Sequence, residues 1–428
     1  MNGREAAFEV LFDGEQNGAF VNAATSKMFD SESLDEKEKS LASALVAGVL
    51  KNRLKLDYII GQFSKTKLRK ISPKVLIILR LGTYQILFMD KIPDSAACNE
   101  SVKLVKKFFS PKSTGFVNGI LRNISRNKDN IKYPKKEDFE DFLSVEYSFP
   151  KWLCKKLVLQ YGKSAAEEFM KNSNEPHGVY IRPNKLKTTV DDLLEMFEKK
   201  DICAKPCENE MVYVCSSVNL LSIEEYKKGL FSIQNISSKK AVDALSPKSG
   251  EVVVDICAAP GGKSCAVAEK MNNSGKIYSF DIYEHKIKLI KKSAERLGIS
   301  IIDARVLNGE NPDESIYEKA DKVLLDAPCS GIGVIHKKPD IKWMRKPEDV
   351  EEISKIQKNL LSASKNYLKP GGILVYSTCT VLKEENEDNI NNFLSDNPNF
   401  EKVFEEKILT SKAGESGFYI CKLKKFEQ

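Results

Sequence analysis

Apolar residues in the first 130 positions of the chain recur at intervals of three to four, the spacing of helices that bury one face. Five such stretches are predicted to be helices: Arg4–Phe12, Lys39–Phe63, Ser72–Phe88, Ala96–Phe109 and Gly115–Arg126. Pro73 suits a helix start, and Ser110 and Pro111 suit the end of one. These patterns predict an all-α bundle over residues 1–135.

The pattern changes in the middle of the chain. Residues 127–136 are polar and basic and are predicted to form a linker. Phe142–Phe169 again has helical periodicity. Three short apolar runs around a helix over Thr189–Lys199 are predicted to be strands: Gly178–Arg182, Ile202–Lys205 and Met211–Val214. We therefore expect a small α+β subdomain over residues 141–235.

Residues 236–428 alternate between buried strands and helices. The strands are predicted at Val252–Ile256, Lys276–Asp281, Ile302–Leu307, Lys322–Asp326 and Gly372–Ser377. Connections of this length favour parallel pairing, and parallel sheets bind ligands at the carboxyl ends of their strands. The unusual polar and thiol residues stand at these ends: Cys257, Asp281, Asn308, Asp326, Cys329 and Cys379. The spacing therefore predicts an α/β domain with a site at one edge of its sheet.

The turn Asp255–Ser264, DICAAPGGKS, joins the first of these strands to a helix. Its glycines let a ligand approach the backbone, and the helix N-terminus offers free N–H groups. A phosphate-binding loop would need glycine at Cys257, and a dinucleotide fingerprint needs glycines that Cys257–Pro260 lack. Asp281, about 20 residues further on, suits a ribose diol. These features indicate a nucleoside-like ligand without phosphate, which S-adenosylmethionine fits.

Charge is unevenly distributed along the 428 residues. Residues 51–136 carry 20 Lys and Arg against 5 Asp and Glu, whereas residues 1–50 carry 4 against 9. A surplus of 15 positive charges in one segment favours a nucleic-acid partner over lysines that merely solvate helix faces. No long apolar run or signal-peptide pattern occurs, so we expect a cytoplasmic protein that does not bind a membrane. We also expect a monomer.

The ten cysteines are irregularly spaced and do not form the pattern of a disulfide framework. We expect them to be mostly reduced and available for chemistry. Cys203, Cys207 and Cys215 have no fourth ligand at zinc-binding spacing. We interpret these three as small apolar core residues and expect no metal.

Two cysteines follow predicted strands, Cys329 in DAPCSGIG and Cys379 in STCT. Either one alone is more often an inert core residue, but two on neighbouring strand-end loops beside Asp326 favour nucleophilic chemistry. Carbon 5 of a pyrimidine becomes reactive towards a methyl donor once a thiolate adds to carbon 6. A cysteine with a pKa of about 8.5 is mostly protonated at neutral pH, so the site must lower that pKa. Lys263 could supply the charge, unless it is a helix-start lysine facing solvent.

The helical part of the chain carries a family resemblance. REAAFEVLF, ILRLGTYQILFMDKIPDSAACNESVKLVKKF and GFVNGILRNISR resemble the RNA-binding domain of the antitermination factor NusB. The resemblance implies a helical RNA-binding module whose basic candidates are Lys103, Lys106, Lys107, Arg122 and Arg126. Asn118 and Arg122 could instead serve helix packing and capping.

The second half resembles the RNA 5-methylcytosine methyltransferases through DICAAPGGKS, DAPCSGIGVIHKKPDIKWMR, LKPGGILVYSTCTVLKEEN and GFYICKLKK. With the NusB-like front end, the chain resembles the small-subunit ribosomal RNA enzymes of the RsmB (Sun/Fmu) type. This implies an all-α NusB-like bundle, a small α+β linker subdomain and a Rossmann-like S-adenosylmethionine-dependent methyltransferase domain. It also implies ribosomal RNA as partner and a target cytosine that is unpaired or flipped out of its helix.

The resemblance assigns roles to the candidate residues. Cys379 would attack carbon 6, Cys329 would assist proton removal or product release, and Asp326 would hold or protonate the cytosine edge. The cofactor would be held by Cys257, Ala258, Ala259, Pro260, Gly261, Gly262, Lys263, Asp281, Lys286, Asn308 and Asp326. The rival functions are a transfer RNA cytosine methyltransferase and an RNA-binding assembly or antitermination factor with an inactive methyltransferase domain.

The chain departs from the family pattern at two places. Asn308 stands where the family has an adenine-contacting aspartate, and Asp303 or Glu310 would serve if the alignment slips there. Gln234 and Asn235 replace a Gln-Asp pair. A basic loop with His336, Lys337, Lys338 and Trp343 follows Cys329. Either its cations grip phosphate while the indole stacks on a base, or Trp343 anchors a long loop.

Overall fold

The computed structural model describes residues 1–18, 21, 24–25, 28–29, 34–175, 178–216, 218–409 and 415–426. The chain divides into two compact units. The helical unit comprises Met1–Asn174 and Lys337–Met344, and the sheet unit comprises Glu175–His336 and Arg345–Gln428. The predicted middle segment 141–235 is shared between them, because its first helices belong to the helical unit.

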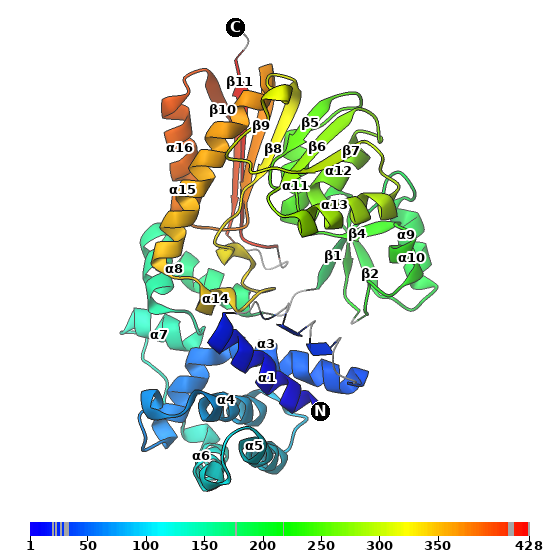
Figure 1. Cartoon of the computed structure of the whole chain (residues 1–428). Helices are drawn as coiled ribbons and strands as arrows, with labels where there is room; N and C mark the ends of the chain where they lie inside the picture. Colours follow the sequence, from blue (N-terminus) through cyan, green and yellow to red (C-terminus); the bar gives the residue numbers. More distant parts are fainter. Residues whose placement is uncertain are drawn as a thin grey trace. The chain divides into compact units, whose positions relative to one another are not determined.

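The helical unit has the all-α architecture that the apolar periodicity predicts (Figure 1). Its α-helices are α1 (Gly3–Asn17), α3 (Glu36–Phe63), α4 (Pro73–Phe88), α5 (Asp94–Phe108), α6 (Thr114–Arg126), α7 (Phe139–Glu146), α8 (Lys151–Asn174) and the short α14 (Ile341–Met344). One continuous apolar core is formed by α1, α3, α4, α5 and α6. The single helix predicted over Phe142–Phe169 is interrupted, because Ser148 has a φ of 57° and Pro150 cannot donate a backbone hydrogen bond.

The sheet unit begins with a four-stranded antiparallel sheet in the order β2-β3-β1-β4. Its elements are β1 (Val179–Pro183), α9 (Val190–Glu198), β2 (Ala204–Cys207), β3 (Met211–Val214), α10 (Glu224–Lys227) and β4 (Phe231–Ile233). Helix α9 begins with a reciprocal cap between Thr189 and Asp192. Leu193 and Phe197 of this helix are fully buried in the core of the small sheet.

The cysteines of this small sheet correct the sequence interpretation. Cys203 and Cys215 are exposed and joined by a disulfide, rather than buried in an apolar core. The pairing of Ala204 with Val214 places the two cysteines opposite each other at the end of the β2–β3 hairpin. Cys207 is half-buried and free.

A seven-stranded sheet in the order β10-β11-β9-β8-β5-β6-β7 forms the rest of the unit. Strands β5 to β9 are parallel, and β10 and β11 add antiparallel pairs at one edge. The strands are β5 (Val252–Asp255), β6 (Lys276–Asp281), β7 (Ile302–Val306), β8 (Ala320–Asp326), β9 (Leu368–Thr378), β10 (Phe400–Ile408) and β11 (Phe418–Lys425). The α-helices are α11 (Ile236–Leu245), α12 (Gly262–Lys270), α13 (Glu284–Leu297), α15 (Pro347–Ser364) and α16 (Glu387–Asp396).

Helices cover both faces of this sheet, because successive apolar residues of its central strands point to opposite sides. Val254 and Leu325 belong to the core under α15 and α16, whereas Val253 and Leu324 belong to the core under α11, α12 and α13 (Figure 1). The predicted Rossmann-like fold is therefore confirmed. Strands β10 and β11, like β4 of the small sheet, were not predicted from the sequence.

Candidate active site

Strand β5 lies between β6 and β8, so the strand order reverses at the centre of the sheet. The loops that follow β5 and β8 diverge there and leave a crevice at the carboxyl edge, where ligands of doubly wound sheets bind. The turn Asp255–Ser264 follows β5, and the segment with Asp326 and Cys329 follows β8. A cavity of about 220 Å³ at this edge is lined by Asp255, Cys257, Ala258, Ala259, Pro260, Gly262, Lys263, Asp326 and four residues from β4 and the start of α11.

Gly261 gives the turn its shape. Its φ of 100° belongs to the left-handed region that favours glycine, and it caps the N-terminus of α12. A Cβ atom here would stand 3.1 Å from the Cα atom of Ile290. The turn is also fastened from the small sheet, because Arg182 of β1 donates to the carbonyl oxygen of Gly262 at 3.1 Å and to the side chain of Gln234. Gln234 donates to the same carbonyl at 3.2 Å.

Asp255 is the most unusual carboxylate in the crevice. It is 1% exposed, and its Oδ2 atom accepts a 2.6 Å hydrogen bond from the Ser264 hydroxyl. Its Oδ1 atom is buried without a hydrogen-bond partner among the described residues. Burial raises the pKa of Asp255 to about 7, despite the Ser264 hydrogen bond. A buried acceptor facing the cavity fits a ligand that carries a positive donor, such as the ammonium group of S-adenosylmethionine.

The remaining predicted cofactor residues stand at the same edge of the sheet. Asp281 ends β6, is 7% exposed, and lies 3.4 Å from the ammonium of Lys286. Asn308 follows β7 and is exposed, with its amide oxygen accepting from the Glu310 N–H at 3.1 Å. Asp303 stands near the start of β7 and pairs with Arg305 at 2.7 Å. Of the two alternatives to Asn308, only Glu310 therefore lies at the carboxyl end.

Asp326 connects the cavity to the cysteines. Its Oδ2 atom lies 2.5 Å from the Lys263 ammonium, and its Oδ1 atom accepts from the Ser377 hydroxyl at 2.8 Å. The Lys263 side chain is only 13% exposed, so it faces Asp326 and not solvent. Asp326 and Ser377 are also register partners in the parallel pair β8–β9. This pairing brings the loops after β8 and β9 together.

Cys329 and Cys379 meet at the end of these loops, with their sulfur atoms 2.8 Å apart. The hydrogen bond between the two thiols lowers the pKa of Cys379 and, with burial, raises the pKa of Cys329. The charge of Lys263 also lowers the pKa of Cys379. In contrast, burial raises the pKa of Cys257 far above its ordinary value, so this third thiol stays protonated. Cys379 is therefore the most acidic of the three thiols.

A buried carboxylate that the sequence analysis missed ties the two cysteine loops together. Glu385 is fully buried, and its carboxylate accepts from the Ser330 N–H at 2.7 Å and from the Ser330 hydroxyl at 2.5 Å. It also accepts from the hydroxyl of Thr380 and the amide of Gln357, both at 3.1 Å. Burial raises the pKa of Glu385 although these bonds favour the charged form. Ser330 and Thr380 are the residues that follow the two cysteines, so Glu385 positions both loops.

The predicted RNA-binding cations of the helical unit lie on two helices that pack together, α5 and α6. All five are exposed: Lys103, Lys106, Lys107, Arg122 and Arg126. Lys103 and Lys107 form surface ion pairs with Glu100 and Glu5. Arg122 donates to Asn118 at 3.0 Å along the helix surface, which leaves its guanidinium at the surface.

The contacts of Trp343 favour the second of the two interpretations of the basic loop that follows Cys329. Within the helical unit, the indole nitrogen of Trp343 donates to the Leu50 carbonyl at 2.9 Å, and Arg53 lies over the ring. The indole thus anchors its loop, and Arg53 occupies one side of the ring. His336 is buried, whereas Lys337 and Lys338 are exposed.

No helix among the described residues is long and apolar enough to cross a membrane. No group of three or more metal-binding side chains occurs in the part of the chain that the structure describes.

The crevice at the strand-order reversal and the glycine turn beside it define a Rossmann-like domain of the kind that binds nucleoside-containing ligands. The 16S rRNA methyltransferase RsmB/F family matches residues 242–424, the NusB family matches residues 1–126, and the RsmF/B-like ferredoxin-like domain matches residues 149–218. The chain belongs to the RsmB/F family of S-adenosylmethionine-dependent RNA methyltransferases. The predicted family and cofactor are therefore confirmed.

The similarity to known proteins covers nearly the full length of the chain. The probable ribosomal RNA small subunit methyltransferase B of Bacillus subtilis is 37% identical over 445 residues, which cover 99% of this chain and 98% of the relative. The ribosomal RNA small subunit methyltransferase B of Shewanella oneidensis is 30% identical over 399 residues, covering 92% and 90%. The crystal structure of PH0851 is 27% identical with a TM-score of 0.80 and covers 99% of this chain and 98% of that one.

Proposed function

We propose that this enzyme transfers a methyl group from S-adenosylmethionine to carbon 5 of a cytosine in small-subunit ribosomal RNA. The reaction proceeds through a covalent bond between Cys379 and carbon 6 of the base. The observation that carries the proposal is the pair of thiols 2.8 Å apart, next to a carboxylate that lines the cofactor cavity. The names of the relatives support ribosomal RNA as the substrate.

We assign the attack to Cys379 because the family resemblance gives that role to the cysteine of the STCT segment, and the contact with Cys329 and the charge of Lys263 favour its thiolate. Its thiolate adds to carbon 6, and the electron pair of the 5,6 double bond becomes available at carbon 5. Once carbon 5 carries the new methyl group, its proton must leave, and the bond between sulfur and carbon 6 breaks. Cys329 stands against Cys379 and is placed to assist this proton removal and release.

Asp326 holds the amidine edge of the cytosine. Lys263 and Ser377 each engage one of its carboxylate oxygens, so its orientation is determined before the base enters. The second lone pairs of these oxygens remain to accept from the amino group of the base, and from its ring nitrogen once that nitrogen has taken a proton from solvent, which neutralises the charge of the adduct.

S-adenosylmethionine supplies an electrophilic methyl group when it is bound. Asp255 would accept hydrogen bonds from its ammonium group, and Asp281 would accept them from its ribose hydroxyls. Cys257, Ala258, Ala259, Pro260, Gly262 and Lys263 line the cavity together with Asp255 and Asp326. The exposed cations of α5 and α6 would bind the RNA backbone.

The test uses full-length Cys329→Ala protein with small-subunit ribosomal RNA and S-adenosylmethionine, analysed on a denaturing gel. Attack by Cys379 proceeds in this variant but release stalls, so a slow-migrating, nuclease-sensitive band is expected. The band should be absent from Cys379→Ala and from the double variant. Cys207→Ala, which alters a half-buried free cysteine of the small sheet, is the matched control and should methylate as the wild type does.

Other outcomes identify the alternatives. An adduct in Cys379→Ala and none in Cys329→Ala would reverse the roles of the two cysteines. An adduct with transfer RNA but not with ribosomal RNA would keep the chemistry and change the substrate. No adduct with either RNA, together with no cofactor binding in calorimetry, would favour an assembly factor with an inactive methyltransferase domain.

A further inference from the structure

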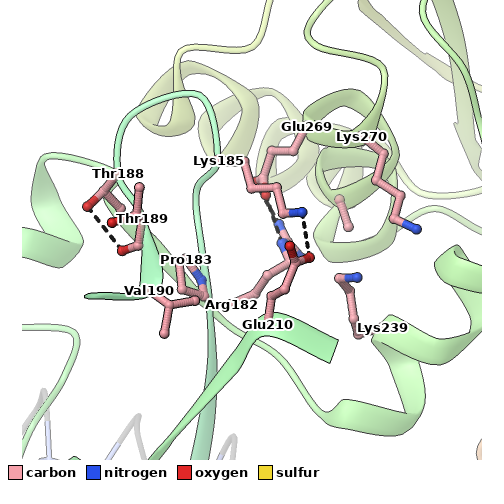
Figure 2. Close-up of a pocket in the computed structure, with 11 residues that line it drawn as sticks. Arg182, Pro183, Lys185, Thr188, Thr189, Val190, Glu210, Lys239, Glu269 and Lys270 are labelled. Carbon is pink, nitrogen blue, oxygen red and sulfur yellow. Dashed lines mark hydrogen bonds and ion pairs between the residues drawn. The ribbon is translucent and has the colours of Figure 1, made fainter. Parts of the chain in front are cut away.

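A second cavity of the sheet unit lies between the small sheet and helices α11 and α12. Its volume is about 300 Å³, the size of a small-molecule site. Arg182, Lys185 and Glu210 contribute from the small sheet and its loops, Lys239 from α11, and Glu269 and Lys270 from α12 (Figure 2). Pro183, Val190, Ala266 and two threonines complete the lining.

The charges of this cavity are unbalanced. Its lining carries four cations and two carboxylates. Arg182 is matched by Glu269, with two contacts of 2.8 and 2.9 Å, and Lys185 is matched by Glu210 at 2.5 Å. Figure 2 shows both pairs joined by dashed lines, whereas Lys239 and Lys270 form no bond to any other residue drawn there.

Lys239 and Lys270 share a single carboxylate outside the cavity lining. Both ammonium groups approach the same atom, Asp243 Oδ1, at 2.6 and 2.5 Å. The Lys239 side chain is only 5% exposed, and burial lowers its pKa, with Lys270 and Lys185 adding repulsion. Two converging ammonium groups with one counterion between them form a site that an anion would stabilise.

We infer that this cavity binds a phosphate group of the substrate RNA, with Lys239 and Lys270 as its two cationic donors. The apolar part of the lining would contact the adjoining ribose. This inference rests on the proposed function for the identity of the RNA. A phosphate diester carries one negative charge, which is the charge that the shared Asp243 leaves uncompensated.

The position of the cavity supports an RNA phosphate over an unrelated metabolite. Arg182 lines this cavity and also donates to the carbonyl oxygen of Gly262 in the cofactor turn. Arg182 therefore connects this cavity to the turn that lines the methyl-donor cavity, and both cavities belong to the same compact unit. We therefore assign the anion site to the backbone of the RNA whose base reacts at that turn.

The test measures RNA binding by the full-length protein as a function of salt concentration. Lys270→Gln, a partly exposed position, should weaken binding about fivefold at about 0.1 M salt and reduce the salt slope by about 0.7–0.9, the value of one phosphate contact. Lys227→Gln is the matched control, because Lys227 is an exposed lysine of α10 paired with Glu224. It should leave both quantities unchanged.

Asp243→Asn is a second variant, for which the affinity for RNA should rise rather than fall. It removes the shared counterion and leaves both ammonium groups for the ligand. RNA should bind more tightly, and inorganic phosphate should raise the melting temperature of this variant more than that of the wild type. A purely structural salt bridge would lower the melting temperature without changing RNA affinity or the phosphate response.

The outcomes separate the possible ligands. If phosphate stabilises the wild type but not Lys270→Gln while the salt slope for RNA is unchanged, the cavity takes a free phosphate compound and the RNA assignment is overturned. If neither the slope nor the phosphate response changes in either variant, the cavity is not an anion site. Because the readout is binding, loss of the proposed cytosine chemistry would leave this test intact.

Discussion

Asp255→Asn is expected to make the ligand-free protein more stable at alkaline pH. Asparagine has the shape of aspartate, and its side-chain oxygen can still accept the hydrogen bond from Ser264. The substitution removes a carboxylate that is 1% exposed and has one oxygen without a partner among the described residues. The cost of burying that charge disappears with it.

The magnitude follows from proton linkage. Burial raises the pKa of Asp255 from 3.8 to about 7. Between these values the folded state keeps a proton that the unfolded state releases, so this group lowers stability as the pH rises. Each pKa unit corresponds to about 1.4 kcal/mol, which gives a penalty on the order of 2 kcal/mol at pH 5 and 4 kcal/mol at pH 8. The advantage of Asp255→Asn should therefore grow by about 2 to 3 kcal/mol between pH 5 and pH 8.

Urea denaturation of both proteins at the two pH values measures this difference. Asp321→Asn, in the same sheet unit, is a control for which stability should fall rather than rise. Burial raises the pKa of Asp321, but hydrogen bonds from Lys369 and the Val252 N–H outweigh it, so the net pKa is lowered. Its carboxylate therefore stabilises the protein above the unfolded pKa, and the stabilisation is lost as the pH falls. Asp321→Asn should thus destabilise the protein at both pH values.

A variant Asp255→Asn that is less stable than the wild type at pH 8, or whose difference does not depend on pH, would refute the reasoning. The gain in stability should be accompanied by a functional loss, since the neutral amide replaces the proposed partner of the cofactor ammonium. Loss of a hydrogen bond to a charged group is worth about 1.5–3 kcal/mol, so cofactor affinity in calorimetry should fall about 10- to 100-fold. Unchanged affinity would place the ammonium elsewhere.

Three other variants test the remaining assignments. Glu385→Gln puts an amide donor at a place towards which backbone and hydroxyl donors already point. The two cysteine loops should therefore shift, and kcat for methyl incorporation should fall about 100-fold with little change in KM. An unchanged kcat would leave Glu385 a purely structural role. Trp343→Ala should cost about 2–3 kcal/mol of stability in urea denaturation and leave RNA affinity unaltered, and the reverse result would restore the base-stacking role. Replacing Lys106, Arg122 and Arg126 together by glutamine should reduce the salt slope of RNA binding by the value of about two to three phosphate contacts. An unchanged slope would mean that the RNA binds a surface other than α5 and α6.

The sequence predicted the catalytic edge because each of its parts is a local signal. A β-branched run followed by a glycine turn indicates a strand and a helix start, and parallel strands bring their carboxyl ends to one edge. This is why Cys329 and Cys379, 50 residues apart, could be expected to meet. The roles of the individual thiols came from the family resemblance, since spacing does not distinguish an attacking cysteine from its partner.

The residues that the sequence analysis missed depend on tertiary contacts. Glu385 stands in the run KEEN, which has the composition of a solvated surface, and only the fold buries it. Strand β10 has seven consecutive positions that are exposed or half-buried, so it lacks the alternation that marks a half-buried strand. The Cys203–Cys215 pair required the β2–β3 register, and Trp343 required knowledge of Leu50, nearly 300 residues away.

Arg182 shows why the small sheet is more than a spacer before the methyltransferase fold. Its side chain is 3% exposed and makes a two-point ion pair with Glu269 of α12, and its remaining contacts are to Gln234 and the carbonyl of Gly262. Burying a guanidinium is costly unless it is paired and hydrogen-bonded, so these contacts hold the small sheet and the cofactor turn in one geometry. The cofactor turn therefore takes part of its shape from a strand that precedes the Rossmann-like domain in the chain. For this reason the glycine turn alone, read as a local motif, does not describe the whole binding site.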